Sequence, residues 1–191
     1  MDQPAREAAL QPHLLGGERI LWTGLPDPNR LFTLGDVFLI PFSLMWGGFA
    51  IFWEAGVIGI GTRPGHAAPY FFILWGMPFI LVGQYLIWGR FIYKRWDRRR
   101  TVYAVTNQRV LTLRGSTLQS MFLNQLPTIN QTARPDGTGT LDFSNLPFGY
   151  AFWANAGMDW FSRRVGQLAF YDIANVANVY GLIADARSGH A

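Results

Sequence analysis

The sequence contains no cysteine, only three histidines and few charged residues, and these shortages argue against several classes of function. Without cysteine there are no disulfides, no thiolate catalysis and no cysteine-based metal sites. His13, His66 and His190 lie in three separate polar segments without the spacing of metal ligands. No Gly-x-Ser-x-Gly motif occurs and no paired carboxylates share a helix face. We therefore expect a protein that is not an enzyme, with no catalytic residue, no metal and no cofactor.

Apolar and aromatic residues dominate the composition instead. Half of the 191 residues are apolar and 16% are aromatic, against 15% that are charged. That balance is typical of a membrane protein with a modest soluble part. A chain of this length accommodates one membrane hairpin and one small domain.

Two long runs contain no charged side chain, Val37–Trp53 and Tyr70–Trp88. At about 1.5 Å per residue the first run covers about 25 Å, just short of the typical hydrocarbon core of about 30 Å. We predict membrane spans at about 34–54 and 70–92. The segment between them, 55–69, is rich in Gly and Pro and is expected to be an external loop.

The distribution of basic residues predicts the orientation. The expected external loop contains a single Lys or Arg residue, Arg63. Six of the sixteen basic residues lie in or just after the second span: Arg90, Lys94, Arg95, Arg98, Arg99 and Arg100. Positive residues stay inside, so both termini are expected to face the cytoplasm, with the protein in the cell inner membrane.

The same six side chains are the main candidate binding residues. We expect them to fix the topology and to contact anionic lipid headgroups through diffuse electrostatics. A defined site for a phosphorylated headgroup is the sharper alternative. Because the patch adjoins an apolar run, it indicates a bilayer partner and no nucleic acid. Two polar groups lie at membrane depth: Asp36, expected to be solvated at the interface, and Gln84.

After Arg100 the pattern changes to the alternation typical of strands. The predicted strands are Thr101–Thr106, Arg109–Arg114, Gln119–Leu126, Thr128–Thr132, Gly139–Phe143 and Gln167–Tyr171. In the first turn, Asn107 is expected to supply a left-handed conformation and Arg109 a structural or membrane-facing contact. From Asp172 the spacing becomes helical, with Asp172 as the predicted N-cap.

Two further segments need an interpretation. Glu18–Gly24 is predicted to be a strand that pairs with another part of the chain, because an isolated strand leaves its backbone groups unpaired. Pro147–Gly166 is rich in aromatic rings and has little periodicity. Its rings either contact the inner leaflet or a partner, or cover the open end of a small barrel. The first interpretation assigns contact to Trp153, Trp160, Phe161, Arg163 and Arg164.

Several short motifs together resemble the bacterial pleckstrin-homology-like (PH-like) membrane proteins of the two-span hairpin type. Tyr103–Leu111 is similar to the family's Tyr-x-Leu-Thr-Asn-x-Arg-Val-Ile hairpin. Glu18–Gly24 resembles its Gly-Glu-x-Ile-Leu-Trp-x-Gly segment, and Gly137–Phe143 its Gly-x-Gly-Thr-Ile-x-Phe strand. Phe170–Ile173, leading into Val176–Ala186, resembles its closing strand and helix.

The fold expected from span pattern and resemblance is an α+β membrane protein. It combines a two-helix transmembrane hairpin with a small antiparallel PH-like β-barrel or sheet, capped by a C-terminal helix. The expected divisions are a cytoplasmic segment 1–30 whose strand 18–24 joins the barrel, the hairpin 31–93, and a cytoplasmic domain 94–191. The resemblance implies binding or scaffolding at the membrane surface, with a protein partner, a lipid or a second copy. The alternative is a small transporter or channel component built from oligomerised hairpins.

Overall fold

The computed structural model describes residues 1–61, 70–144, 155–158 and 168–189. It divides into two compact units. Residues 32–93 form the first, here called the hairpin unit. Residues 1–31 and 94–191 form the second, the sheet unit.

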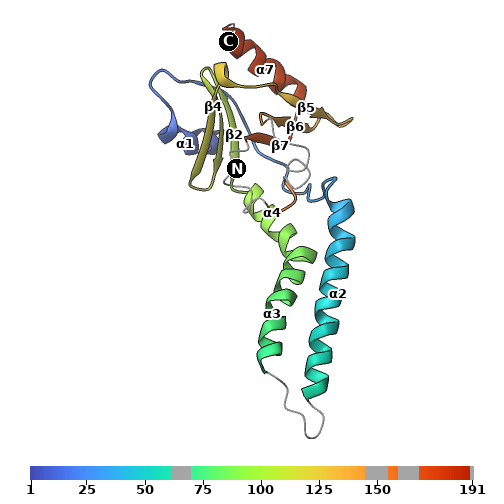
Figure 1. Ribbon diagram of the computed structural model, residues 1–191. Helices are drawn as coiled ribbons and strands as arrows, with labels where there is room; N and C mark the ends of the chain where they lie inside the picture. Colours follow the sequence, from blue (N-terminus) through green and yellow to red (C-terminus); the bar gives the residue numbers. More distant parts are fainter. Residues whose placement is uncertain (62–69, 145–154, 159–167, 190–191) are drawn as a thin grey trace. The chain divides into compact units, whose positions relative to one another are not determined.

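The hairpin unit consists of two long helices that are apolar on all sides and the start of a shorter, amphipathic helix. In chain order they are α2 (Asp36–Gly61), α3 (Tyr70–Gln84), a π-helical turn η2 (Tyr85–Gly89) and α4 (Arg90–Arg98), whose last residues belong to the sheet unit. Figure 1 shows α2 and α3 side by side. Two helices, Asp36–Ile60 and Tyr70–Arg98, are long and apolar enough to cross a membrane.

Helix α2 continues well beyond the predicted span, which was expected to end near residue 54. It includes Gly56, Gly59 and Gly61, which the sequence pattern assigned to a loop. Glycine weakens a helix in water because a glycine backbone loses more conformational freedom on folding than that of other residues. Glycine is nevertheless common in apolar membrane helices. As a result Trp53 and Glu54 lie within the helix rather than at its end.

Glycines also set how closely α2 and α3 approach. A methyl group built on Gly83 would lie 3.0 Å from the Cα of Gly47, and one built on Gly47 would lie 2.8 Å from a side-chain carbon of Ile87. Contacts this short leave no room for a larger side chain. Small residues of this kind let two apolar helices pack closely through their backbones, as is common between membrane helices.

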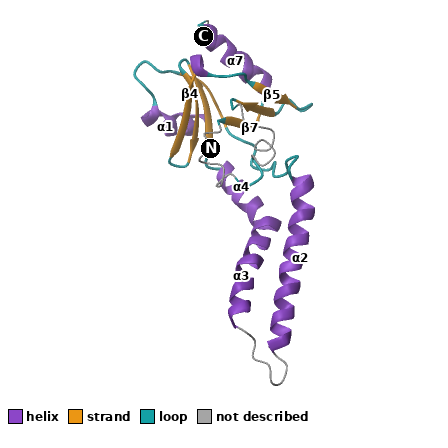
Figure 2. Ribbon diagram, viewed as in Figure 1, coloured by secondary structure: helices purple, strands orange, loops and turns teal. Residues whose placement is uncertain are grey.

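The sheet unit contains seven strands and four helical segments besides the end of α4 among its described residues; Figure 2 shows strands and helices in different colours. The helical segments are α1 (Gln3–Leu10), the adjoining 3₁₀ turn η1 (Gln11–His13) and α7 (Val176–Ser188), with a further 3₁₀ turn η3 (Leu123–Gln125). The strands are β1 (Ile20–Gly24), β2 (Thr101–Thr106), β3 (Arg109–Arg114), β4 (Thr117–Phe122), β5 (Asn130–Ala133), β6 (Gly139–Asp142) and β7 (Ala169–Ile173).

The first sheet has the order β1-β2-β3-β4, with all neighbours antiparallel. Its central strand β2 is buried along its whole length because both faces of the sheet are covered. Successive side chains of a strand point to opposite faces. Accordingly Tyr103 and Val105 enter one apolar cluster, while Val102 and Ala104 enter another that includes Leu10 of α1.

The second sheet, β5-β6-β7, contributes to the larger of the two cores. Phe170 of β7 lies at its centre, fully buried, with its ring stacked on Tyr103 at 4.7 Å and edge-on to Phe143 at 5.0 Å. Helix α7 adds Val179 and Ile183 to the same cluster. Offset and edge-on ring pairs of this kind add about 1 kcal/mol each to the burial of apolar area.

The described strands form two separate sheets and no closed barrel. Strand β4 ends at Phe122, whereas the pattern predicted a strand up to Leu126. The chain turns through η3 there, and Leu123 and Leu126 are both buried in the larger core. Pro127 follows, and proline has no backbone N–H to continue a ladder. The chain therefore leaves the first sheet after Phe122 and turns into the core, and β4 does not extend to Leu126 as predicted.

The end of the chain also differs from the prediction that Asp172 caps the last helix. Asp172 lies in β7 with a φ of 49°, and α7 begins later, at Val176. Asn175, with a φ of 50°, is the residue before the helix, and its side chain makes no capping hydrogen bond. The helical spacing expected for this segment is present in α7, where Val176, Val179 and Ile183 are buried, although Tyr180 is 39% exposed.

Candidate functional site

The six basic residues Arg90–Arg100 divide into a buried and an exposed set. Arg90, Lys94 and Arg98 recur every fourth residue, which places them on one face of α4, and all three are buried. Arg95, Arg99 and Arg100 are exposed. A helix with one face buried and the other polar separates its charges in this way.

Arg90 is bound within the hairpin unit. Its guanidinium forms an ion pair with the Asp36 carboxylate, and both side chains are almost completely buried. The Arg90 Nε donates to the carbonyl of Leu86 at 2.8 Å. The backbone N–H and the hydroxyl of Thr33 donate to Asp36 Oδ2 at 2.5 and 2.9 Å, whereas Arg90 binds Oδ1. Asp36 is therefore paired and buried, not solvated as the sequence led us to expect.

Arg98 is bound within the sheet unit. Its guanidinium lies 2.5 Å from Asp172 Oδ2, donates to the Asp27 carbonyl at 2.5 Å and to Asn155 Oδ1 at 2.9 Å. Arg134 Nη1 lies 2.7 Å from the other oxygen of Asp172. Burial raises the pKa of the Asp172 carboxyl, but the two guanidiniums outweigh it, so that its pKa lies below the ordinary value.

Lys94 completes the buried set, because its ammonium donates to the Leu31 carbonyl at 2.7 Å. For Arg90, Lys94 and Arg98 the structure thus provides partners within the chain. Contact with lipid headgroups stays a prediction that falls on the exposed set. Next to the exposed arginines, Trp96 is about half exposed. The guanidinium of Arg100 lies 4.0 Å from the centre of the Trp96 ring. An exposed ring among arginines is typical of a membrane interface.

The hairpin motif also has a structural partner. Arg109 Nε and Nη2 donate to the two carboxylate oxygens of Glu18 at 2.9 and 3.0 Å, and Thr106 Oγ1 donates to the same carboxylate at 2.7 Å. Burial raises the pKa of Glu18, and the hydrogen bonds from Arg109, Leu15 and Thr106 more than offset it, leaving the pKa below its usual range. Of the two roles left open for Arg109, the structural one is therefore observed.

Asn107 acts differently from the prediction. Its φ is not positive, so it does not supply a left-handed turn. Its side chain instead accepts from the backbone N–H of Arg19 at 2.9 Å and donates to the Gly17 carbonyl at 3.4 Å. The Asn107 backbone N–H donates to the Arg19 carbonyl at 3.2 Å. Asn107 thus holds the N-terminal segment against the β2–β3 turn.

A cavity of about 430 Å³ lies between β1 and α7 in the sheet unit. Trp22 and Thr23 line it on one side, and Asn178 and Leu182 on the other. The Thr23 hydroxyl and the Arg6 Nε, both at this cavity, have no hydrogen-bond partner among the described residues. The sequence pattern did not indicate this cavity, since its walls come from segments at opposite ends of the chain.

The remaining candidate residues, Trp153, Trp160, Phe161, Arg163 and Arg164, lie outside the described residues. The choice between membrane contact and closure of the sheets by these rings is therefore untested. Within the described ranges, no three His, Asp or Glu side chains are grouped so that they could hold a metal ion. Comparisons with protein-family models, with curated proteins and with solved structures found no match for this chain.

Proposed function

We propose that this chain is an inner-membrane protein in which a two-span hairpin anchors a cytoplasmic PH-like module. The module binds at the membrane surface without catalysing a reaction. Support for the anchor comes from the two long apolar helices, and support for the module from its antiparallel sheets and C-terminal helix. The order of these elements follows that of the family which the motifs resemble.

The observation that carries the proposal is the sorting of charges on α4 and just after it. Three basic side chains are buried and bound within the chain, Arg90 and Arg98 by carboxylates and Lys94 by a backbone carbonyl, and three remain exposed at the end of an apolar helix. Each basic residue near an anionic leaflet contributes about 1 kcal/mol of attraction. Attraction of this kind at Arg95, Arg99 and Arg100 supports the proposal that this end of the helix is held at a negatively charged surface.

The test is the selectivity of the full-length protein for anionic lipid. Protein reconstituted in bilayers of phosphatidylethanolamine with a trace of spin-labelled phosphatidylglycerol should hold the anionic label more strongly than a zwitterionic one. The double variant Arg95→Gln/Arg99→Gln should lose most of that preference. A matched control, Arg19→Gln/Arg187→Gln, removes two exposed charges elsewhere in the sheet unit and should keep it. Equal loss in both variants would contradict the proposal.

A second candidate, a small transporter or channel component, is favoured by one specific observation. The two long runs without a charged side chain, Val37–Trp53 and Tyr70–Trp88, argue against it. Glu54, however, lies within α2 and is buried. Charged groups within membrane helices often mark a pathway. Ion flux in liposomes that contain the purified protein, abolished by Glu54→Gln, would favour this candidate over the first.

A further inference from the structure

Glu54 is the one described acidic side chain of the hairpin unit that has no partner. It is 5% exposed, and neither carboxylate oxygen has a hydrogen-bond partner among the described residues. By contrast, Asp36 in the same helix is fully engaged with Arg90 and Thr33. Removing a carboxylate from water without pairing it costs several kcal/mol, so such a group calls for a ligand or counter-ion.

The carboxylate of Glu54 lies against Gly76 of α3. A Cβ placed on Gly76 would overlap the carboxylate, with the Glu54 Cδ only 2.9 Å away. Glycine is therefore what allows the acid to sit between the two helices. Gly76 is also part of the wall of a cavity, so the Glu54 carboxylate lies next to one of the residues that line that cavity.

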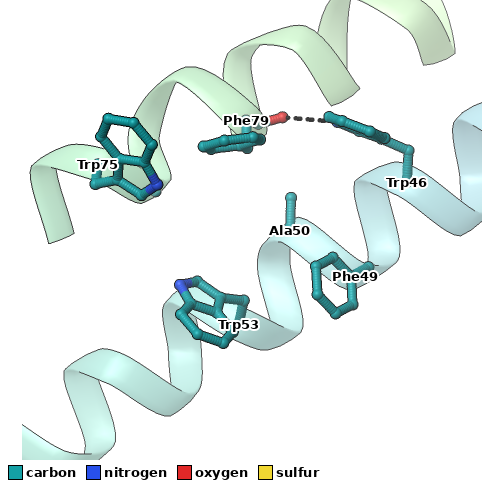
Figure 3. Close-up of a pocket in the computed structure, with 7 residues that line it drawn as sticks. Trp46, Phe49, Ala50, Trp53, Trp75 and Phe79 are labelled. Atoms are coloured by element: carbon teal, nitrogen blue, oxygen red, sulfur yellow. Dashed lines mark hydrogen bonds between the residues drawn. The ribbon is translucent and has the colours of Figure 1, made fainter. Parts of the chain in front are cut away.

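The cavity itself lies between α2 and α3 and has a volume of about 300 Å³. Figure 3 shows its aromatic walls: Trp46, Phe49 and Trp53 come from α2, and Trp75 and Phe79 come from α3. Trp46 is held in place by its indole N–H, which donates to the Phe79 carbonyl at 3.3 Å. The floor is Ala50, one helical turn before Glu54 and on the same face of α2.

The chemistry of these walls selects the ligand. Five aromatic rings attract a cation through the negative faces of their π-systems, especially the three indoles. A buried carboxylate at the edge supplies the counter-charge, and the apolar walls suit an apolar body. Arg90, the other charged group described in this unit besides the two acids, is already bound to Asp36. A volume of about 300 Å³ is within the range of small-molecule sites.

We propose that this cavity binds a lipophilic organic cation, such as a quaternary ammonium or phosphonium ion, with Glu54 as counter-ion. The rings that line it are largely exposed on the apolar surface of the hairpin, so the ligand enters from the hydrocarbon side. This inference concerns the hairpin unit alone and does not depend on the lipid selectivity proposed for Arg95 and Arg99.

The test uses the full-length protein in nanodiscs of zwitterionic lipid, with radiolabelled tetraphenylphosphonium as the probe and empty nanodiscs as the background. Wild-type protein should show saturable binding. Glu54→Gln should weaken it at least tenfold, while thermal unfolding shows that the variant is folded, as expected when an unpartnered charge is removed. Trp75→Leu should weaken it several-fold with Glu54 intact. Tetraphenylborate, an anion of the same shape, should gain no affinity from Glu54.

Three results would overturn the proposal. The first is no saturable tetraphenylphosphonium binding to the wild type. The second is binding to Glu54→Gln within twofold of the wild type, which would show that the carboxylate is not the counter-ion. The third is saturable binding that emerges only in Arg63→Gln, which would identify Arg63, outside the described residues, as the group that neutralises Glu54.

Discussion

Glu18 and Arg109 are joined by two charge-assisted hydrogen bonds, although 91 residues separate them in sequence. The paired atoms are Nε with Oε1 and Nη2 with Oε2, a fork geometry that only arginine offers. The carboxylate is completely buried, and Thr106 donates a third hydrogen bond to it. This contact joins the segment before the hairpin unit to the first strand pair after it.

Breaking that pair should destabilise the sheet unit strongly. Glu18→Gln leaves the buried Arg109 guanidinium without its counter-charge, and we expect a loss of about 3 kcal/mol in the free energy of unfolding. The loss should be measurable by urea-dependent proteolysis of the full-length protein in mild detergent. Arg19→Gln, which changes an exposed neighbour, should cost less than 0.5 kcal/mol or so. The double variant Glu18→Gln/Arg109→Met should cost less than the sum of its single changes.

Low pH should destabilise the same unit through two carboxyls. The pKa values of Glu18 and Asp172 are lowered in the folded chain, so the folded state binds fewer protons than the unfolded state. Their contribution is complete above the unfolded values near 4.5 and 3.8, and it is lost as the pH falls through the lower folded values. The melting temperature should stay level from pH 7 to about 5 and fall below about pH 4.

The comparison for this pH dependence is the double variant Glu18→Gln/Asp172→Asn. It should be less stable at pH 7 and show a shallower decline in acid, because its two uncharged side chains no longer titrate. Asparagine tolerates the left-handed φ of residue 172 about as well as aspartate, so the change tests charge rather than backbone strain. An equally steep decline in the variant would show that other groups control acid unfolding.

High pH should destabilise the sheet unit through ionisation of Tyr103. Burial raises its pKa to about 12, although the Tyr171 N–H, which donates to its hydroxyl at 3.2 Å, opposes the shift. The folded state therefore keeps this proton to a higher pH than the unfolded state does. The contribution of Tyr103 to the free energy of unfolding is complete below pH 10 and is lost as the pH rises from about 10 to 12. Absorbance titration near 295 nm should show a late ionisation that disappears in Tyr103→Phe. A titration that is the same in both proteins would contradict this assignment.

The Asn107 side chain should stabilise the N-terminal segment locally. Asn107→Ala removes both side-chain hydrogen bonds to the N-terminal segment and should cost about 1 kcal/mol for each well-made bond. The effect should be faster amide hydrogen exchange in α1 and at Arg19, with β6 and β7 unaffected. Gln108→Ala, in the same turn, serves as the control. If both variants exchange alike, the Asn107 side chain does not hold the segment.

Parts of this fold follow from local pattern alone. Strands β2 and β3 have the bounds predicted from the sequence, because alternation and a two-residue turn specify them without reference to distant residues. The roles of acidic residues do not follow in this way. Asp172 resembles a helix cap locally, yet its partner Arg98 lies 74 residues earlier. Only the packed structure brings the two together.

The hairpin unit shows the same limit. Glycines after Trp53 resemble a loop by the rules of water-soluble chains, and the predicted first span therefore ended at Glu54 beside them. In the structure the helix nevertheless continues to Gly61, and Glu54 is buried against Gly76 of α3. The basic patch was recognised as a cluster, but its division into buried and exposed sets depends on partners such as Asp36 and Asp172.

The central claim, a hairpin that crosses the membrane twice with both termini in the cytoplasm, is tested most directly by reporter fusions. Alkaline phosphatase, active only after export, is fused after Gly61 or after Gly189, and a cytoplasmic reporter is placed at the same positions. We expect active phosphatase at Gly61 and inactive phosphatase at Gly189, with the opposite pattern for the cytoplasmic reporter. Active phosphatase at Gly189, or none at Gly61, would contradict it.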